Sequence, residues 1–346
     1  MAFMLEVESS TDDAFSSVTP QQSCEVSTPI KKHKPMDAYK LDELSSNSVV
    51  IWTHHNVDLD AVASCWAYET FVLIPQNKRP VFKFCSAAWD GEGMGEHDVA
   101  LDVYAGGRGI KGEHSIDGHV HSCFKTIVEL YAQEQDRLAI MPIITMIDTQ
   151  DTFGSVYQHL LARRVDLETR KVFDRTGLNA VLSALRSQYR GDDLELVNQM
   201  RTILSGMLSN GRSYLEAKKE ASNVEILPGG RVAILNNASR GVYRVLFEDY
   251  NIDAVVYVDG FNMGVIRSNR IAHIRMDDEV IRDVVRKAGE YTRSEGGSNF
   301  WYPHPSGFLF AHGTYKAPSS EPSKVDPKEL AMVVDALIKK SNKRGL

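Results

Sequence analysis

Residues 48–73 read SVVIWTHHNVDLDAVASCWAYETFVL, and this stretch decides the fold class. The continuous apolar run at 49–52 is typical of a strand that is buried on both faces. From Ala61 onward, apolar residues recur at the spacing of one helix face. Polar residues therefore stand between the end of a buried strand and the start of a helix, which is where open α/β sheets bind their ligands.

The same alternation of strand and helix continues along the chain. Apolar patterns predict strands at 80–85, 97–103 and 138–147, and a helix at 122–133. Strands that alternate with helices imply an α/β fold with a mostly parallel sheet flanked by helices.

A second, smaller α/β domain is predicted from the C-terminal half. The sequence at 225–237 is typical of a hairpin, strands are expected at 253–260 and 262–276, and a helix at 277–292. Asp326-Pro327 is a typical helix start, with a capping residue followed by proline. The predicted organisation is a disordered tail at 1–46, an α/β domain at 47–175, a helical connector at 176–222, a second α/β domain at 223–320 and a C-terminal helix at 321–346.

Composition excludes several classes of function. The 346 residues suffice for about two domains, and 39 Lys and Arg against 46 Asp and Glu give a net charge of −7. This balance argues against a uniformly basic surface for long duplex nucleic acid. No run reaches the roughly 18 apolar residues of a membrane helix, and the start is acidic, so we expect no secretion signal and no membrane partner. The four cysteines form no CxxC pair, which favours reduced thiols in a cytoplasmic protein.

One imidazole and two carboxylates follow the first predicted strand, at His54, Asp58 and Asp60. On a strand-to-helix turn, their spacings of four and two residues let all three side chains converge on one point. Carboxylates together with imidazole suit Mn²⁺, Mg²⁺ or Fe²⁺ better than a thiolate zinc site would. The alternative is that Asp58 and Asp60 cap the helix that follows them.

Two further predicted strands end in aspartate, at Asp102 and Asp148. A single aspartate after a strand is often only a turn or cap residue, but the ends of parallel strands line one edge of a sheet. Clustered carboxylates repel one another unless a cation lies between them. Two divalent ions about 3.5–4 Å apart, with a bridging hydroxide, are the usual device for hydrolysing phosphoesters. The candidate metal ligands are His54, Asp58, Asp60, Asp102, His114 and Asp148.

These residues resemble the motifs of the DHH phosphoesterase superfamily. The first motif, His-x-Asn-Pro-Asp-x-Asp-Ala, matches residues 54–61, with Val57 in place of the proline. Asp102 matches the second motif and Asp148 the fourth. The third motif, Asp-His-His, is best matched by Glu113-His114-Ser115, in which only the central histidine is kept.

The resemblance implies catalytic roles for Asp58, Asp60 and His114. The second histidine of the third motif contacts the reacting phosphate in the family, and Ser115 stands in its place. His119 or His121 could take over this role. The alternative for these two histidines is a polar loop next to a helix start.

The second domain resembles the DHH-associated C-terminal domain, in which a Gly-Gly-Gly-His loop follows an Arg-Ser pair. Here a glycine pair precedes a histidine after an insertion, and an Arg-Ser pair lies upstream. Glycines let backbone N–H groups approach a phosphate, and arginine binds it with a fork of donors. The resemblance implies substrate binding by Arg267, Ser268, Arg270, Gly296, Gly297 and His304.

The activity implied by the resemblance is that of a metal-dependent phosphohydrolase, phosphodiesterase- or exonuclease-like, with a hydroxide activated by two ions, Mn²⁺ or Mg²⁺. The acidic balance favours a short oligonucleotide or small nucleotide over a long strand as substrate. Phe300, Trp301 and Tyr302 either stack on a base or pack against the sheet.

The departure in the third motif leaves a second hypothesis. The chain could be a catalytically impaired DHH-like protein that binds a nucleotide or a metal as a sensor or scaffold. A structural α/β protein with fortuitous acids is the third alternative. A homodimer is one of the oligomeric states compatible with the sequence.

Overall fold

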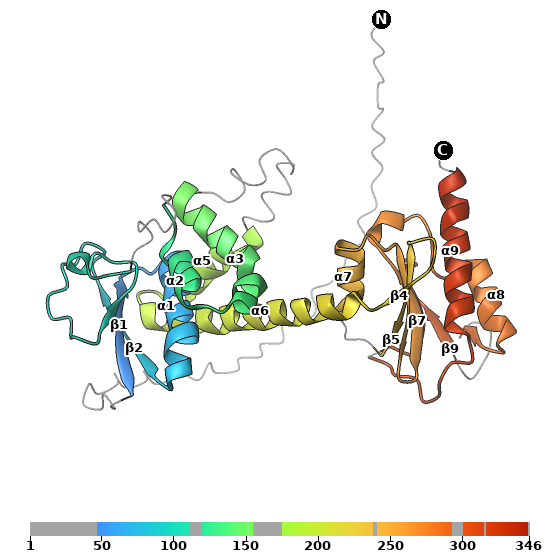
Figure 1. Ribbon diagram of the computed structural model, residues 1–346, viewed down its shortest axis with the longest axis horizontal. Helices are drawn as coiled ribbons and strands as arrows, with labels where there is room; N and C mark the ends of the chain where they lie inside the picture. The colour runs from blue at the N-terminus through green and yellow to red at the C-terminus, as the bar shows by residue number, and fades with distance from the viewer. Residues whose placement is uncertain are drawn as a thin grey trace, which may run out of the picture. The chain divides into compact units, whose positions relative to one another are not determined.

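The computed structural model describes residues 47–110, 120–154, 175–237, 241–292, 300–314 and 316–344 (Figure 1). It is an α/β protein, as the sequence predicts, with one three-stranded parallel sheet and one mixed sheet that has seven strands among the described residues. None of its described helices is both long enough and apolar enough to span a membrane. The predicted tail at 1–46 and the predicted site residues His114, His119, Gly296 and Gly297 lie outside the described residues.

The three-stranded sheet has the order β2-β1-β3. Its central strand β1 (Ser48–His54) pairs in parallel with β2 (Arg79–Cys85) on one side and β3 (Val99–Ala100) on the other. The apolar run at 49–51 is buried, as expected for a central strand with both faces covered. The register sets His54 beside Cys85, so β1 and β2 end together.

Helices cover this sheet and form the first core. The residues of α1 from Leu59 to Ala67 are buried all round, which explains why its apolar residues extend beyond one stripe. Trp66 and Phe124 are among the largest buried side chains of this core. The helices are α1 (Leu59–Tyr68), α2 (Cys123–Tyr131), α3 (Glu134–Phe153), α5 (Leu178–Gln188) and α6 (Asp193–Ala221).

The strand predicted at 138–147 is wrong, because these residues belong to α3. Ile140, Ile143, Ile144 and Ile147 are buried, whereas Met141 between them is exposed, which is helical spacing. The near-continuous apolar run conceals this period in the sequence. Asp148 consequently lies inside a helix and not at the end of a strand.

Two other predicted strands are shorter than expected. The strand predicted at 97–103 is reduced to β3, and Asp102 after it adopts a left-handed backbone with φ of 56°. The strand predicted at 262–276 ends with β7 (Asn262–Arg267), and a single 3-10 turn, Asn269–Ile271, follows.

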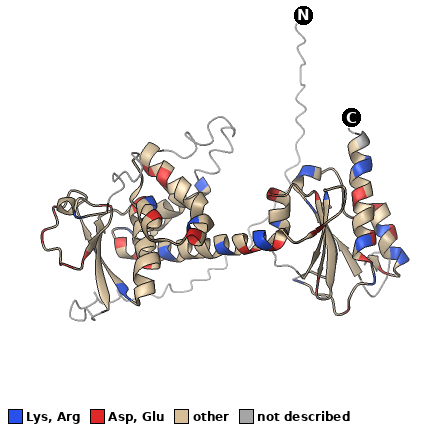
Figure 2. Cartoon of the chain, in the orientation of Figure 1, with Lys and Arg blue, Asp and Glu red and all other residues tan. Residues whose placement is uncertain are grey.

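The predicted connector at 176–222 is helical, as expected, and consists mainly of α5 and α6. Near its N-terminus, α6 contributes Leu196, Met200 and Leu204 to the first core. Near its C-terminus, Ala217 and Ala221 pack into a core that also contains residues of β5 and α7. Both acidic and basic residues occur along α6, with acids in its first turn and lysines in its last (Figure 2).

The second sheet has the order β4-β5-β6-β7-β10-β9-β8, and most of its neighbouring strands are antiparallel. The hairpin predicted at 225–237 is present as β4 and β5. Asp326 accepts a hydrogen bond from the N–H of Lys328 at the start of the C-terminal helix, as its sequence predicts. The elements not yet bounded are β4 (Glu225–Ile226), β5 (Val232–Asn236), α7 (Val242–Glu248), β6 (Ala254–Asp259), α8 (Glu279–Lys287), β8 (Tyr291–Thr292), β9 (Phe300–Pro303), β10 (Leu309–His312) and α9 (Pro327–Arg344).

Candidate metal centre

The turn between β1 and α1 presents the first predicted ligands. His54 is the last residue of β1, and Asp58 is the N-cap of α1, where its Oδ1 accepts the N–H of Ala61 at 2.9 Å. Asn56 between them has a left-handed backbone with φ of 55°, a conformation that asparagine tolerates well. The turn thereby brings the side chains of a strand end and a helix cap close together.

Asp193, the first residue of α6, holds this turn in place. Its carboxylate accepts the backbone N–H of Asn56 at 3.0 Å and that of Val57 at 3.3 Å. Arg186 on α5 donates to the carbonyl of Val57 at 2.5 Å. Neither residue is predicted from the sequence, because nothing in their spacing indicates a contact about 130 residues away along the chain.

The Asp193→Ala substitution is expected to lower the affinity for Mn²⁺ by about 10-fold to 100-fold, since two N–H groups of the turn lose their acceptor. Isothermal titration calorimetry on the full chain measures this affinity. Asp192→Ala is the matched control, because Asp192 caps α6 through the N–H of Glu195 and has no such contact with the turn. Equal affinities for the two variants would show that the turn needs no support from Asp193.

His54, Asp58 and Asp102 form a cluster whose potential ligand atoms all lie within 4.8 Å of one another. His54 Nε2 is 3.2 Å from Asp102 Oδ2 and 3.8 Å from Asp58 Oδ1. Asp102 reaches this position because its N–H donates to the carbonyl of Ile110 while its own backbone turns left-handed. The structure therefore brings together three of the six ligands predicted from the sequence.

The hydrogen bonds of His54 prepare it to bind a cation. Its Nδ1 lies 2.9 Å from the carbonyl of His55, which can only accept, so Nδ1 carries the proton of that bond. Nε2 is then directed at Asp102. The hydrogen bond with Asp102, the carbonyl of His55 and the charges of Asp58 and Asp102 outweigh burial and raise the pKa of His54 to about 9. A cation is thus favoured at Nε2, whether it is a proton or a metal ion.

Asp60 is not part of this cluster and caps a different helix. Its carboxylate is buried and accepts the N–H groups of Cys123 at 2.8 Å and Phe124 at 2.9 Å, at the start of α2. Burial and the charge of Asp102 raise the pKa of Asp60 well above its usual range. The capping alternative thus describes the contacts of both acids, but only Asp58 caps the helix that follows it.

The Asp60→Ala substitution is expected to lower the free energy of unfolding by about 2–4 kcal/mol, because two buried N–H groups lose their acceptor. Asp58→Ala, which removes one partly buried cap contact, should cost about 1 kcal/mol. Urea denaturation of the metal-free protein measures both. A larger cost for Asp58→Ala would contradict this assignment of the two caps.

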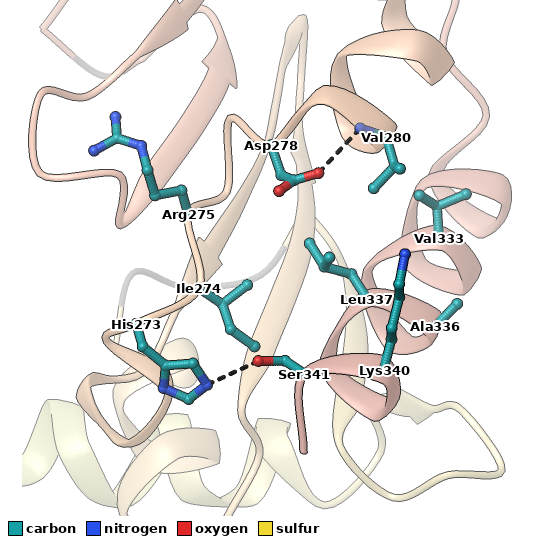
Figure 3. A pocket seen from close by; sticks show the side chains of 10 residues that line it. All are labelled: His273, Ile274, Arg275, Asp278, Val280, Val333, Ala336, Leu337, Lys340 and Ser341. Carbon is teal, nitrogen blue, oxygen red and sulfur yellow. Dashed lines mark hydrogen bonds between the residues drawn. The ribbon is translucent and has the colours of Figure 1, made fainter. Parts of the chain in front are cut away.

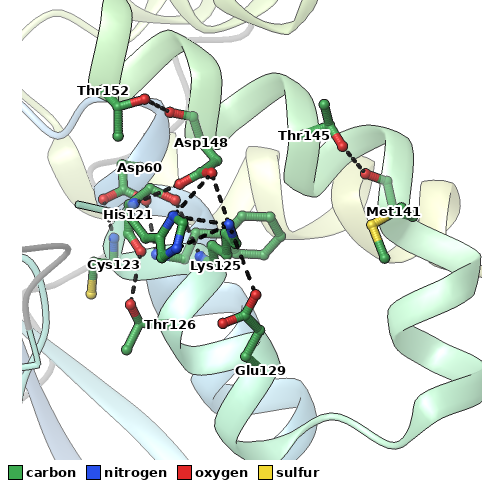
Figure 4. A network of polar contacts seen from close by, with 12 residues as sticks. Asp60, His121, Cys123, Lys125, Thr126, Glu129, Met141, Thr145, Asp148 and Thr152 are labelled. Carbon is green, nitrogen blue, oxygen red and sulfur yellow. Dashed lines mark hydrogen bonds and ion pairs between the residues drawn. The ribbon is translucent and has the colours of Figure 1, made fainter. Parts of the chain in front are cut away.

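Asp148 lies in a polar network with residues of α2 and the segment before it (Figure 4). It accepts the N–H of Ser122 at 2.8 Å, and its Oδ2 is 3.2 Å from Lys125 Nζ and 3.4 Å from His121 Nδ1. Lys125 Nζ is also 2.9 Å from His121 Nδ1. Asp148, which the sequence assigns to the metal, is thus engaged by an ammonium.

Asp151 is an acid of this region that the sequence analysis misses. It follows Asp148 by three residues on α3, so the two lie on the same side of the helix. Burial and the charges of Asp102, Asp58 and Asp148 raise its pKa to about 6. Interpreting 138–147 as a helix would have revealed Asp151. Several carboxylates are thus close enough to repel one another, and a bound cation would reduce this repulsion.

The residues predicted to bind substrate are divided between two places. Arg267 is buried and donates to the carbonyls of Ser268 at 3.2 Å and Ser306 at 3.4 Å. His304 Nδ1 is 3.0 Å from the hydroxyl of Ser306, so the Arg267 side chain and the turn with His304 are joined through one residue. Arg270 instead donates to Asn251 and to a carbonyl beside it.

Two polar atoms beside this turn have no hydrogen-bond partner among the described residues, Arg267 Nε and Ser268 Oγ. Burial lowers the pKa of Arg267. The aromatic residues of β9 alternate: Trp301 is buried against Phe310, whereas Phe300 and Tyr302 are exposed. The packing alternative therefore holds for Trp301, whereas stacking of Phe300 or Tyr302 on a base stays a prediction.

A hollow of about 530 Å³ in the C-terminal part offers no comparable set of ligands (Figure 3). His273 in its wall bonds to the hydroxyl of Ser341 at 3.0 Å, and Asp278 accepts the N–H of Val280 at 3.1 Å as the cap of α8. Among the described residues, Asp278 is the only carboxylate that lines it. His54, Asp58 and Asp102 therefore remain the candidate centre among the described residues.

Comparison with known proteins adds three distant structural likenesses. No protein-family model matches the chain, and no curated protein matches it. An uncharacterized protein from Helicobacter pylori G27 matches with a TM-score of 0.22 and 10% identity, over 84% of this chain and 99% of that one. RecJ from Thermus thermophilus, solved in complex with Mg²⁺, matches with a TM-score of 0.24 and 10% identity, over 84% of this chain and 50% of that one. An exopolyphosphatase-related protein from Bacteroides fragilis matches with a TM-score of 0.24 and 12% identity, over 85% of this chain and 92% of that one.

Proposed function

We propose that this chain is a DHH-type, metal-dependent phosphohydrolase that acts on a short oligonucleotide or a small nucleotide. The observation that carries the proposal is the cluster of His54, Asp58 and Asp102, with its ligand atoms within 4.8 Å of one another. One imidazole and two carboxylates form a donor set that suits Mn²⁺ or Mg²⁺. The raised pKa values of His54 and Asp151 support it. The hydrogen bond with Asp102 is the main cause for His54, burial is the main cause for Asp151, and the charges of Asp58 and Asp102 contribute to both.

In this proposal His54, Asp58 and Asp102 hold a divalent cation, Mn²⁺ by preference. Such a cation supplies charge neutralisation at a phosphate and lowers the pKa of water. The carbonyl of His55 keeps His54 Nε2 directed toward the centre, and Asp193 fixes the turn that carries Asp58. Asp60 contributes indirectly, because it ties the start of α2 to the same turn.

The substrate residues of the proposal are Arg267 and His304, with Ser268 beside them. Arg267 supplies a positive charge for a phosphate. Its terminal nitrogens donate to the carbonyls of Ser268 and Ser306, and Ser306 in turn contacts His304. The exposed rings of Phe300 and Tyr302 in the neighbouring strand could each stack on a base. This arrangement favours a nucleotide over plain polyphosphate. We leave Arg270 out of the binding residues, because its contacts are with Asn251 and Ile252, whereas Arg267 is joined to the turn with His304 through Ser306.

The test is release of phosphate or mononucleotide in about 1–5 mM Mn²⁺ or Mg²⁺. The substrates are a dinucleotide, a pentanucleotide, a 3′,5′-bisphosphate nucleotide, pyrophosphate and polyphosphate. We expect release from one of the nucleotidic substrates, abolished by chelation and by the Asp58→Asn substitution. Release that survives both would contradict the proposal, and release from polyphosphate alone would contradict the substrate class.

A specific observation favours the sensor or scaffold as the second candidate. Asp60 caps α2 and Asp148 pairs with Lys125, so two of the six predicted ligands are engaged in contacts within the protein. Such a protein would bind the metal ion and the nucleotide without hydrolysing it. Stoichiometric Mn²⁺ binding without release from any substrate would favour this candidate.

A further inference from the structure

We propose that the Lys125 ammonium takes the place of a second divalent cation, so that the centre holds one metal ion and one fixed ammonium. This inference rests on the metal ion that the proposed function assigns to His54, Asp58 and Asp102. It departs from the two ions predicted from the sequence. It also gives a role to a residue that the sequence analysis does not single out.

The surroundings of Lys125 Nζ resemble a metal site in their chemistry (Figure 4). The nitrogen lies 3.2 Å from Asp148 Oδ2, 2.9 Å from His121 Nδ1 and 3.9 Å from Glu129 Oε1. Two carboxylates and one imidazole are a donor set that Mn²⁺ or Mg²⁺ would otherwise use. The side chains of Lys125, Asp148 and His121 are 20%, 18% and 10% exposed, so water only partly screens this charge.

The start of α2 links this group to the proposed metal centre. Ser122 donates its N–H to Asp148, and the next two residues donate theirs to Asp60. Asp60 itself follows Asp58 by two residues on the turn that carries the metal ligands. The N–H groups of three successive residues, 122–124, thus bind both Asp148 of α3 and Asp60 of the turn. Lys125 is the next residue along the chain.

A second divalent ion would have to displace this ammonium. Asp148 already accepts the N–H of Ser122 through Oδ1, and its Oδ2 faces Lys125. A divalent ion close to the ammonium would be repelled by it, and removing the ammonium would break its contacts with Asp148, His121 and Glu129. The ammonium is covalently tethered beside Asp148, whereas a divalent ion can dissociate from it.

The test is a count of bound Mn²⁺ in the full chain, by elemental analysis after desalting and by calorimetric titration. We expect one ion per chain in the wild type, two in Lys125→Met, and one in Lys125→Arg, which keeps the charge. The double variant Lys125→Met/Asp148→Asn should bind one ion again, because it lacks the Asp148 carboxylate that the loss of Lys125 makes available to a second ion. Circular dichroism confirms folding, and Lys125→Gln replaces Lys125→Met if the latter does not fold.

The outcomes separate this inference from the function on which it rests. Two ions in the wild type, or one ion in the charge-removing variants, would overturn the inference while leaving the metal centre in place. No bound ion in folded wild-type protein would overturn the metal centre and the inference together. The number of bound Mn²⁺ ions is measured without substrate, so a lack of hydrolysis alone does not contradict this inference.

Discussion

The Asp102→Asn substitution is expected to weaken Mn²⁺ binding at least about 100-fold and to reduce phosphoester hydrolysis by about 1,000-fold. Asparagine keeps the size of the side chain and tolerates the left-handed backbone at this position, where φ is 56°. The substitution therefore removes a negative charge with little strain. Calorimetric titration with Mn²⁺ measures the affinity, and release from the cleaved nucleotide measures the rate.

Glu96→Gln is the matched control for Asp102→Asn. Glu96 is an exposed carboxylate six residues before Asp102. It is expected to change neither quantity by more than about twofold, as for most surface substitutions. If Asp102→Asn bound Mn²⁺ as the wild type does, Asp102 would not be a ligand and the cluster would lose its central carboxylate.

Mn²⁺ binding is expected to release about one proton per ion at pH 7.5, and its apparent affinity should rise about tenfold per pH unit from 7 to 8.5. The reason is that His54, with a pKa of about 9, holds a proton at the position that the metal ion takes. Asp151, with a pKa of about 6, is largely ionised throughout this range. Titrations in buffers of different ionisation enthalpy count the released protons.

The same pKa sets the opposite trend for the stability of the metal-free protein. His54 has a higher pKa in the folded chain than its ordinary value of 6.5, so protonation favours folding. This contribution is complete below pH 6.5 and is lost as the pH rises through about 9.

An affinity for Mn²⁺ that did not change from pH 7 to 8.5, without proton release on binding, would show that His54 Nε2 is not a ligand.

The sequence predicts the part of the centre that is local in the chain. A buried strand followed by a polar turn and an apolar helix fixes the place of His54 and Asp58, since both spacings are short. The α/β class follows from the alternation of elements and is confirmed. Asp102 could also be found, because it lies two residues after the end of the short strand β3, which pairs with β1.

The remainder depends on tertiary contacts that spacing does not show. Asp60 and Asp58 are equally good ligands by spacing, yet their carboxylates cap two different helices. Asp148 looks like the end of a strand only while the helical period of α3 is overlooked, and Asp151 is hidden by the same misinterpretation. Asp193 acts on a turn 136 residues away, a contact that follows from how α6 packs.

Anomalous X-ray scattering at the manganese edge, measured on crystals of the full chain grown with Mn²⁺, shows directly whether His54, Asp58 and Asp102 bind a metal ion. We expect an anomalous peak within about 2.5 Å of His54 Nε2 and of a carboxylate oxygen of both Asp58 and Asp102. A peak bound by other residues, with none at this cluster, would contradict it.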